Sequence, residues 1–335
     1  MFVPLLLALP LVAAHQHHLH APVANVENEE WYKKYGNQHV LAYTAPLSFM
    51  HLPYAKCLED ASHAFDIAIL VPFRYDPVVS PQRAVKPQSI CLGSPNRGYT
   101  LAWDISPFGF GARIMDCGDV PLTLMENAKA IDQMEVAYSA LLARPHRGHG
   151  LKEHPRLVTL GVIVLPILRS LHTIPAIHFD AHFDTAGVED QVDQGRISHG
   201  SYFTIAAEEN PLSNTSIHSG ICQKMGGRAV VEHDESVGFQ VISSEDIDDY
   251  GIQTVIQKIR DRVGMGPVLD IDAGAWTTRE VKCILRGLAG LNFVGCDIVE
   301  RLPRAAAIGI VDDFPQMLQA DAPPKPRGGP FWDDD

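Results

Sequence analysis

The sequence predicts a three-layer α/β/α fold, in which a mainly parallel, doubly wound sheet lies between two layers of helices. Two observations predict it. Short apolar runs alternate along the chain with longer segments of helical periodicity. Several of these runs are continuously apolar, which is typical of parallel strands covered on both faces. Such alternation favours one doubly wound sheet, with functional residues at the carboxyl ends of its strands.

The candidate strands are short, apolar and bounded by polar or turn-forming residues. In chain order they are Asp66–Phe73, Arg113–Asp116, Leu157–Leu160, Ala176–Asp180, Phe239–Ile242, Pro267–Asp272 and Phe293–Val299.

Three expected helices follow a Ser or Thr whose third successor is acidic, the pattern of an N-terminal capping box. They are Leu124–Arg144 after Thr123 and Glu126, a helix to about Val263 after Ser243 and Asp246, and Glu280–Leu288 after Thr277 and Glu280. Gly290 should end the last of them.

The domain organisation is simple. We find no internal repeat and no linker, and we expect one domain over residues 41–321, after a polar segment at 15–40. Residues 74–112 hold several Pro and Gly without sustained periodicity, which predicts a long loop. The Pro-, Gly- and Asp-rich tail, residues 322–335, should be disordered.

The first 14 residues predict a secretory signal peptide. Phe2–Ala14 is uncharged, mostly apolar and too short for the ~20 residues that span a bilayer. It ends in Val12-Ala13-Ala14, a small-residue cleavage pattern. The alternative is a frayed N-terminus or a buried strand. A signal peptide predicts a secreted, extracellular protein with no membrane anchor after cleavage.

Three further features depend on the compartment. The His-rich run His15–His20 either binds metal weakly or is simply a disordered mature N-terminus. Asn214-Thr215-Ser216 is a glycosylation sequon that can be used only in the secretory path. The six cysteines show no zinc-finger spacing. Their positions do not distinguish disulfides from buried thiols.

The charge balance limits the partners. The chain has 27 Lys+Arg and 40 Asp+Glu, a formal charge of −13. A net acidic chain is a poor candidate for phosphate-backbone binding, so we expect no nucleic-acid partner. Acidity suits a cationic substrate or metal ions, although a solvated acidic surface is the commoner cause. Hydrophobic residues at 46% exclude a disordered chain.

The segment Ala176–Asp184 (AIHFDAHFD) carries the clearest chemical signal. An apolar strand runs into Asp180, His182 and Asp184, which are spaced by two. On an extended chain this spacing points side chains the same way. The three side chains should therefore converge on a metal ion. The alternative is a polar strand end with surface carboxylates.

Asp270 and Asp272 repeat this arrangement at the end of another apolar run. Five carboxylate or imidazole ligands without Cys suit Mn²⁺ better than structural zinc. Shared carboxylates can bridge two ions, and two ions roughly 3.5–4 Å apart can generate a hydroxide and stabilise developing charge.

The chain resembles the ureohydrolase family of arginases and agmatinases over roughly residues 30–72 and 113–312. With its leader it looks most like the secreted, fungal-type agmatinases. The segments that carry the resemblance are MDCGDVPLT (115–123), IHFDAHFDT (177–185), SHGSYF (198–203), VLDID (268–272) and WTTREVKCILRGLAGLNFVGCDIVE (276–300).

The resemblance implies the three-layer fold, a site for two Mn²⁺ ions and assembly as trimers or hexamers. It implies that a metal-bound hydroxide hydrolyses a guanidinium C–N bond, turning agmatine into putrescine and urea. Position by position, the implied metal ligands are Asp180, His182, Asp184, Asp270 and Asp272. Among these, Asp180 and Asp270 bridge the ions.

Two histidines outside that ligand set are of interest. His199 matches the family's active-site histidine, with proton transfer or substrate contact as its implied role. His178 lies on the same side of the strand as Asp180 by parity. It is either a substitute ligand or a strand histidine that supports the ligands.

The chain departs from the family pattern at three places. The family's Gly-Gly-Asp-His segment, whose His is a metal ligand, is missing at Gly161–Val162. The Pro- and Gly-rich loop with an acid for the guanidinium is missing after Asp272. Gly111-Ala112-Arg113 only partly matches the family's loop before MDCGD. The first departure should weaken one metal site, and the second should slow catalysis.

These departures leave several readings open. In one reading, the sequence comes from a truncated gene model that has lost short coding stretches at two joins, Gly161–Val162 and Asp272–Ala273. Alternatively, the chain is an inactive, secreted metal-binding protein. If it is active, the substrate can also be another guanidino compound, arginine or guanidinobutyrate, because the missing loops would separate these substrates.

Overall fold

The computed structural model describes thirteen segments of the chain: residues 29–36, 48–70, 99–104, 106, 108, 112–123, 126–146, 154–161, 164–171, 173–187, 196–272, 276–299 and 304–325. The predicted signal peptide, the His-rich run, most of the loop at 74–112 and most of the tail lie outside them. So do Val162 and Ala273, one residue of each join. The domain bounds 41–321 stay a prediction.

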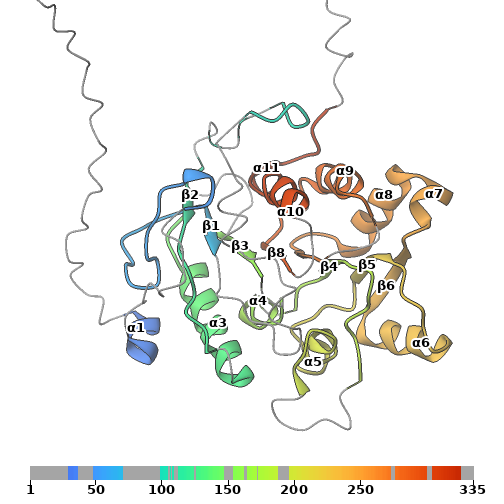
Figure 1. Cartoon of the computed structure of the whole chain (residues 1–335), viewed down its shortest axis with the longest axis horizontal. Helices are drawn as coiled ribbons and strands as arrows, with labels where there is room; N and C mark the ends of the chain where they lie inside the picture. The colour runs from blue at the N-terminus through green and yellow to red at the C-terminus, as the bar shows by residue number, and fades with distance from the viewer. Residues whose placement is uncertain are drawn as a thin grey trace, which may run out of the picture.

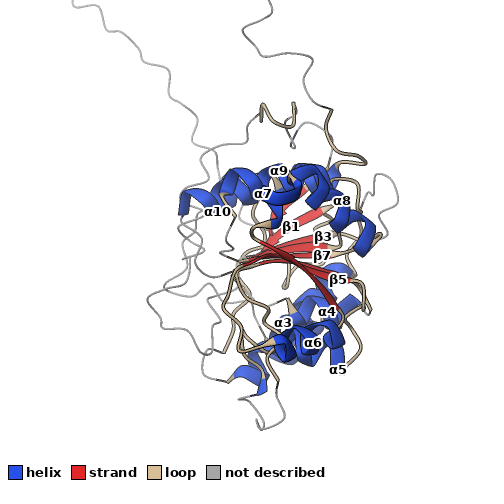
Figure 2. Ribbon diagram, turned by 90° about the vertical axis from the view of Figure 1, so that its right-hand side faces the viewer, coloured by secondary structure: helices blue, strands red, loops and turns tan. Residues whose placement is uncertain are grey.

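Within the described residues, eight parallel strands form one sheet in the order β2-β1-β3-β8-β7-β4-β5-β6. Their bounds are β1 Ile67–Leu70, β2 Ile114–Asp116, β3 Arg156–Leu160, β4 Ala176–Phe179, β5 Ser216–Ile221, β6 Phe239–Ser243, β7 Val268–Ile271 and β8 Gly295–Ile298. Helices cover both faces of the sheet, so the predicted three-layer α/β/α fold is confirmed (Figures 1 and 2).

One helical layer comprises α3 Asn127–Leu142, α4 Leu165–Leu171, α5 Tyr202–Glu208 and α6 Arg228–Val237. The other comprises α7 Asp246–Tyr250, α8 Ile252–Val263, α9 Thr278–Leu288, α10 Arg304–Val311 and α11 Phe314–Gln319. The short helices α1 Glu30–Tyr35 and η2 Phe49–His51 precede the sheet. Among the described residues, no helix is both long and apolar enough to cross a membrane.

Residues of each strand alternate between two apolar clusters. In β4, Ile177 and Phe179 belong to the cluster under α8 to α11, whereas Ala176 belongs to the cluster under α3 to α5. His178 therefore faces α3 to α5, since successive side chains of a strand point to opposite faces. The helices α3 to α5 thus cover the face of the sheet on which the polar side chains at the end of β4 lie.

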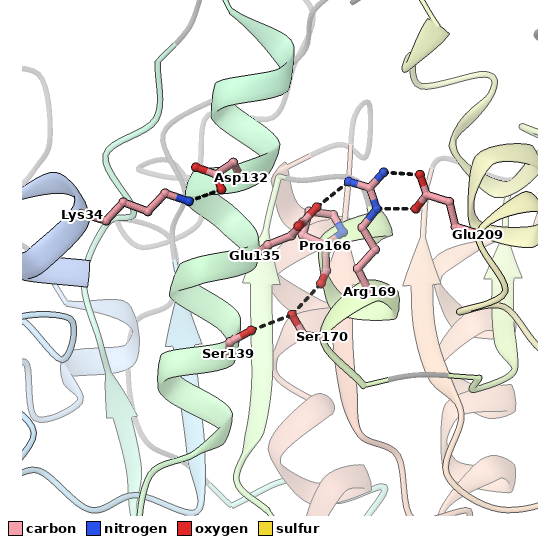
Figure 3. Close-up of polar contacts among 8 residues, drawn as sticks. All are labelled: Lys34, Asp132, Glu135, Ser139, Pro166, Arg169, Ser170 and Glu209. Atoms are coloured by element: carbon pink, nitrogen blue, oxygen red, sulfur yellow. Dashed lines mark hydrogen bonds and ion pairs between the residues drawn. The ribbon is translucent and has the colours of Figure 1, made fainter. Parts of the chain in front are cut away.

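Ion pairs join the helices of that layer at their surface (Figure 3). Arg169 of α4 binds Glu135 of α3 and makes two hydrogen bonds to Glu209, which follows α5. Lys34 of α1 pairs with Asp132 of α3. Because these groups are partly exposed, each pair contributes at most about 1 kcal/mol, and the main effect is to fix the register of the helices.

The three capping predictions have three outcomes. Thr277 and Glu280 form the predicted capping box at the start of α9. The prediction at Thr123 is wrong, because α3 begins at Asn127 after Glu126 without a side-chain cap. Instead, the Thr123 N–H donates to Gln133 in the helix.

The helix predicted after Ser243 is broken in two. Its start is only partly as expected: Asp246 accepts a hydrogen bond from the Ser243 N–H, but α7 begins at Asp246 after Glu245 without a side-chain cap. Gly251 then separates α7 from α8 with φ = 81°, in the region that favours glycine.

Helix α1 lies inside the segment predicted to be polar. Its Trp31 is buried against the core. A disulfide between Cys57 and Cys117 then joins the chain before β1 to the end of β2. Arg144 reinforces this edge, because its guanidinium donates to the Cys57 carbonyl at 2.6 Å and pairs with Glu29. The N-terminal segment is therefore part of the core at this edge.

Asp312, between α10 and α11, gives a stability prediction. Burial raises the pKa of its carboxyl to about 6; the Lys282 ammonium opposes the rise and Asp313 adds to it. Its ordinary value is about 3.9. Because the folded state holds this proton more tightly, the stabilisation is complete below pH about 4 and is lost as the pH rises through 6. Asp312→Asn should therefore stabilise the protein at pH 7.5 by about 2 kcal/mol.

Urea unfolding of Asp312→Asn and wild type at pH 5 and pH 7.5 checks this expectation. The gain should be clearly smaller at pH 5, where most of the native carboxyl is protonated. Asp321→Asn is the matched control, because Asp321 is exposed, and its substitution should change stability little at either pH. An equal effect of Asp312→Asn at both values would contradict the raised pKa.

Candidate metal centre

The candidate site lies where β4 and β7 end next to each other. These strands are neighbours in the sheet, and His178 is paired with Asp270. Asp180 follows the last residue of β4, and Asp272 follows the last residue of β7. Because parallel strands end at the same edge, the two predicted metal segments meet at the carboxyl edge of the sheet, as expected.

The path of the chain through the first metal segment differs from the prediction. The strand stops at Phe179, so Asp180, His182 and Asp184 do not lie on one extended chain. The chain turns, with the His182 N–H donating to Asp180 Oδ1 at 3.1 Å, and Asp184 adopts φ = 54°. Asp tolerates this left-handed conformation better than most residues. Alternation along a strand therefore does not bring the three side chains together, although those of Asp180 and Asp184 still meet.

His178, Asp180 and Asp184 form a group whose candidate ligand atoms all lie within 4.8 Å of one another. Asp180 and His178 are buried, and Asp184 is half-buried. His182 is mostly exposed, with 62% of its side chain accessible, but its Nδ1 lies 3.2 Å from Asp180 Oδ1. The structure thus brings Asp180 and Asp184 together and adds His178, whereas His182 contacts Asp180 from outside this group.

Of the two acids of the second segment, Asp270 is the one that is fully buried. Tyr202 of α5 donates its hydroxyl hydrogen to Asp270 Oδ2 at 2.8 Å. The other oxygen, Oδ1, is buried without a hydrogen-bond partner. Burial raises the pKa of Asp270 to about 7; the Tyr202 hydrogen bond opposes the rise and the nearby Asp180 carboxylate adds to it. Asp272 is half-buried and lies outside the three-residue group.

The pKa values of His178, on β4, and of Asp180, directly after β4, both shift downward. Burial disfavours the charged Asp180, but the hydrogen bonds and positive charge that His182 and His178 can supply outweigh it, and the pKa falls. Burial lowers the pKa of His178 to about 3, although Asp180 opposes the shift. At neutral pH the pair is therefore a carboxylate beside a neutral imidazole.

Behind His178 runs a chain of buried hydrogen bonds. His178 Nδ1 lies 2.9 Å from His218 Nδ1, and His218 Nε2 lies 3.0 Å from Asp234 Oδ1. Thr185 donates to the same Asp234 oxygen at 2.7 Å. His218 also stacks on Phe239, with ring centroids 3.7 Å apart. His178 is thus held in place through His218 on β5 and Asp234 on α6, both of which lie outside the segment Ala176–Asp184.

His199 lies in the turn before α5 and is half-buried. Its Nδ1 atom is buried without a hydrogen-bond partner. The turn is joined to the metal segment, because the Ala186 N–H donates to the Gly200 carbonyl at 2.7 Å. The predicted catalytic histidine therefore sits on a loop tied to the residues that follow Asp184.

Sequence reasoning missed Tyr202, His218 and Asp234. Tyr202 lies in the quoted SHGSYF segment but has no motif of its own. His218 lies on β5, which was not predicted, because SIHSGI holds only two large apolar side chains, Ile217 and Ile221, although all six residues are buried. Asp234 lies on α6 beyond any of the motifs.

The donor set fits a divalent cation. Carboxylate oxygens and imidazole nitrogens are gathered without a thiol, and the unpaired Asp270 oxygen lacks the partner that a buried carboxylate needs. A parallel α/β sheet with such donors at its carboxyl edge defines a metal-binding α/β enzyme.

The model of the Arginase family matches residues 69–309. A Schizosaccharomyces pombe protein that carries an agmatinase name is 39% identical over 300 residues, covering 76% of each chain. Guanidinobutyrase of Pseudomonas aeruginosa is 28% identical over 246 residues, covering 66% of this chain and 72% of that one. The structure of proclavaminate amidino hydrolase from Streptomyces clavuligerus superposes with a TM-score of 0.69 at 21% identity, covering 82% of this chain and 98% of that chain.

The chain belongs to the arginase family and is an agmatinase-like ureohydrolase. The predicted family and enzyme class are thereby confirmed. The superposition at low identity supports the arginase-like fold alone.

Proposed function

We propose that the protein hydrolyses agmatine to putrescine and urea with the help of Mn²⁺. The observation that carries the proposal is the cluster of Asp180, Asp184 and His178 at the sheet edge, beside the unpaired oxygen of Asp270. The identity to a protein with an agmatinase name supports the choice of substrate. The donor set supports Mn²⁺, which accepts carboxylate and imidazole ligands together.

The residues of the chain perform separate tasks. Asp180, Asp184, Asp270 and the imidazole of His182 would hold the ions, with Asp272 completing the set. Bound Mn²⁺ supplies a Lewis acid that activates water near neutral pH. His199, on its tethered loop, would pass a proton to the departing amine.

A substrate assay with the purified full-length chain tests this proposal. We expect urea release from agmatine with added Mn²⁺ and none after chelation with EDTA. Stoichiometric Mn²⁺ binding without urea release would instead identify an inactive metal-binding protein. That result would agree with the missing segments at Gly161–Val162 and after Asp272.

Guanidinobutyrate is the second candidate substrate, because of the 28% identity to a guanidinobutyrase. Agmatine ends in an ammonium, guanidinobutyrate in a carboxylate, and arginine carries both. Comparing kcat/KM for the three compounds therefore shows which charged group on the substrate the site prefers. We expect agmatine to lead by at least about tenfold, equivalent to 1.4 kcal/mol of transition-state stabilisation. A lead of guanidinobutyrate would overturn the agmatinase assignment but not the family.

We also propose that the protein is secreted and acts as a trimer or hexamer. The apolar leader and the Cys57–Cys117 disulfide support the secretory path, since disulfides persist mainly in oxidising compartments. The assembly follows from the family resemblance, and light scattering of the purified protein measures it. A monodisperse monomer would contradict the assembly.

Glycosylation gives a test of the secretory path. Asn214 is exposed in the turn before β5, where a glycan can extend into solvent. When the full chain is produced in a eukaryotic host, we expect an N-glycan at this residue. Its mass should disappear after glycosidase treatment and in Asn214→Gln. Retention of an unglycosylated chain, with its leader, inside the cell would contradict secretion.

A further inference from the structure

The hydrogen bonds behind His178 determine where its proton lies. Asp234 Oδ1 accepts from Thr185 and lies 3.0 Å from His218 Nε2, so the proton of His218 is on Nε2. The lone pair of His218 is then on Nδ1. His178 Nδ1, at 2.9 Å from that atom, must donate to it. The remaining nitrogen of a neutral His178, Nε2, therefore carries a lone pair.

This lone pair points at other acceptors. His178 Nε2 lies 3.5 Å from Asp180 Oδ2 and 3.5 Å from the Tyr202 hydroxyl oxygen. The Tyr202 hydroxyl has one hydrogen, which it donates to Asp270 Oδ2, with the two oxygens 2.8 Å apart. The Nε2 lone pair of His178 thus faces a carboxylate oxygen of Asp180, and the two side chains are only 0% and 2% exposed. Buried acceptors without a donor are costly, and a cation between them satisfies both.

The distances fit one ion. Ligand atoms that bind one ion at roughly 2.0–2.2 Å lie within about 4.4 Å of each other. The three candidate atoms of His178, Asp180 and Asp184 lie within 4.8 Å before any ion draws them closer. The fully buried Oδ1 of Asp270, which has no hydrogen-bond partner, is a second, independent observation that favours a cation at this edge of the sheet.

We propose that His178 binds one metal ion through Nε2, together with Asp180 and Asp184, and that His218, Asp234 and Thr185 hold it in the tautomer this requires. The inference rests on the proposed function in assuming Mn²⁺ as the ion. It goes further by assigning a ligand on β4 and a supporting chain on β5 and α6. Ordering of a ligating imidazole by a partner on its other nitrogen is a general device of metal sites.

Electron spin echo envelope modulation of bound Mn²⁺ tests the ligand directly, without reading activity. The full chain is labelled with ¹⁵N-histidine and carries Ser at the four histidines of the His-rich run: His15, His17, His18 and His20. The second predicted imidazole ligand is removed by His182→Asn, a substitution at a mostly exposed side chain. With up to one Mn²⁺ per chain, we expect histidine nitrogen coupling to persist in this variant. The coupling should disappear when His178→Gln is added.

The outcomes separate the inference from the proposed function. Bound Mn²⁺ without nitrogen coupling in His182→Asn, or coupling that survives His178→Gln, would overturn the role of His178. So would the absence of Mn²⁺ binding in His182→Asn alone. If the protein with intact His178 and His182 binds no Mn²⁺, the proposed function itself fails. Circular dichroism confirms that each variant is folded before the measurement.

His218→Phe tests the supporting chain. The ring of His218 packs among aromatic side chains of Phe183, Phe203 and Phe239, so Phe preserves the packing and removes only the hydrogen bonds. We expect Mn²⁺ affinity to fall by about 10- to 100-fold, as for other partners of ligating histidines. His233→Phe, on the same helix as Asp234, is the control and should leave the affinity unchanged. Equal affinity in His218→Phe and wild type would overturn the supporting role.

Discussion

Asp180→Ala is expected to abolish urea release from agmatine, lowering kcat/KM by at least about 1000-fold, or roughly 4 kcal/mol. Asp180 is buried at the end of β4 and lies within reach of His178, His182 and Asp184. Each candidate ligand set uses it, so its removal weakens metal binding and leaves the neighbouring imidazoles without their shared carboxylate. Urea release and Mn²⁺ titration of the purified variant measure the two effects together.

Two further variants make this result interpretable. Asp180→Asn keeps the size of the side chain and removes its charge, so loss of metal in this variant separates ligation from packing. Asp261→Asn, on the exposed surface of α8, removes an acidic charge far from the site and should retain full activity. Wild-type turnover in Asp180→Asn would contradict the metal assignment of this residue.

Removal of the Cys57–Cys117 disulfide should lower the free energy of unfolding by about 4 kcal/mol. The bridge spans 60 residues of sequence, and closing a loop of that length restricts the unfolded chain by about this amount. Both sulfurs are fully buried, and Arg144 is anchored on the Cys57 carbonyl. Denaturant unfolding of the Cys57→Ser, Cys117→Ser double variant measures the loss.

Cys222→Ser provides the control for this experiment. Cys222 is a free, exposed thiol, so its replacement should change stability by less than about 0.5 kcal/mol. Wild-type protein unfolded in the presence of dithiothreitol should match the double variant. A double variant as stable as the oxidised wild type would show that the edge formed by β2 is held by packing alone.

The sheet was largely predictable because its strands are apolar enough to be recognised one by one. Seven of the eight strands in the described residues correspond to predicted segments; β4 and β7 end one residue earlier than predicted, before Asp180 and Asp272, whereas β3 and β6 are one residue longer. Strand β5 escaped because Ser216, His218 and Ser219 are polar in sequence yet fully buried. This burial is a tertiary effect, in which hydrogen bonds with Ser213 and Ala176 satisfy Ser216 and a contact with Asp234 satisfies His218.

The site was predictable in composition and less so in geometry. Spacing identified Asp180, His182 and Asp184, but the turn after Phe179 and the positive φ of Asp184 depend on hydrogen bonds that a two-residue period does not describe. The environment of Asp270 depends on Tyr202, which comes from a helix 68 residues away. The local sequence pattern therefore identifies the residues that carry candidate metal-ligand atoms, whereas long-range packing determines which of these residues meet.

The strand order also governs how the protein can be assembled during synthesis. Strands β1 to β3 form one half of the sheet and β4 to β6 the other, and they are joined only through β8 and β7 in the centre. The two central strands are the last to leave the ribosome. Until residue 271 has emerged, Asp180 has no Asp270 beside it, and until residue 298 has emerged, the two parts of the sheet keep unpaired inner edges. Such edges invite aggregation, so the final quarter of the chain acts as the closing element for both the sheet and the site.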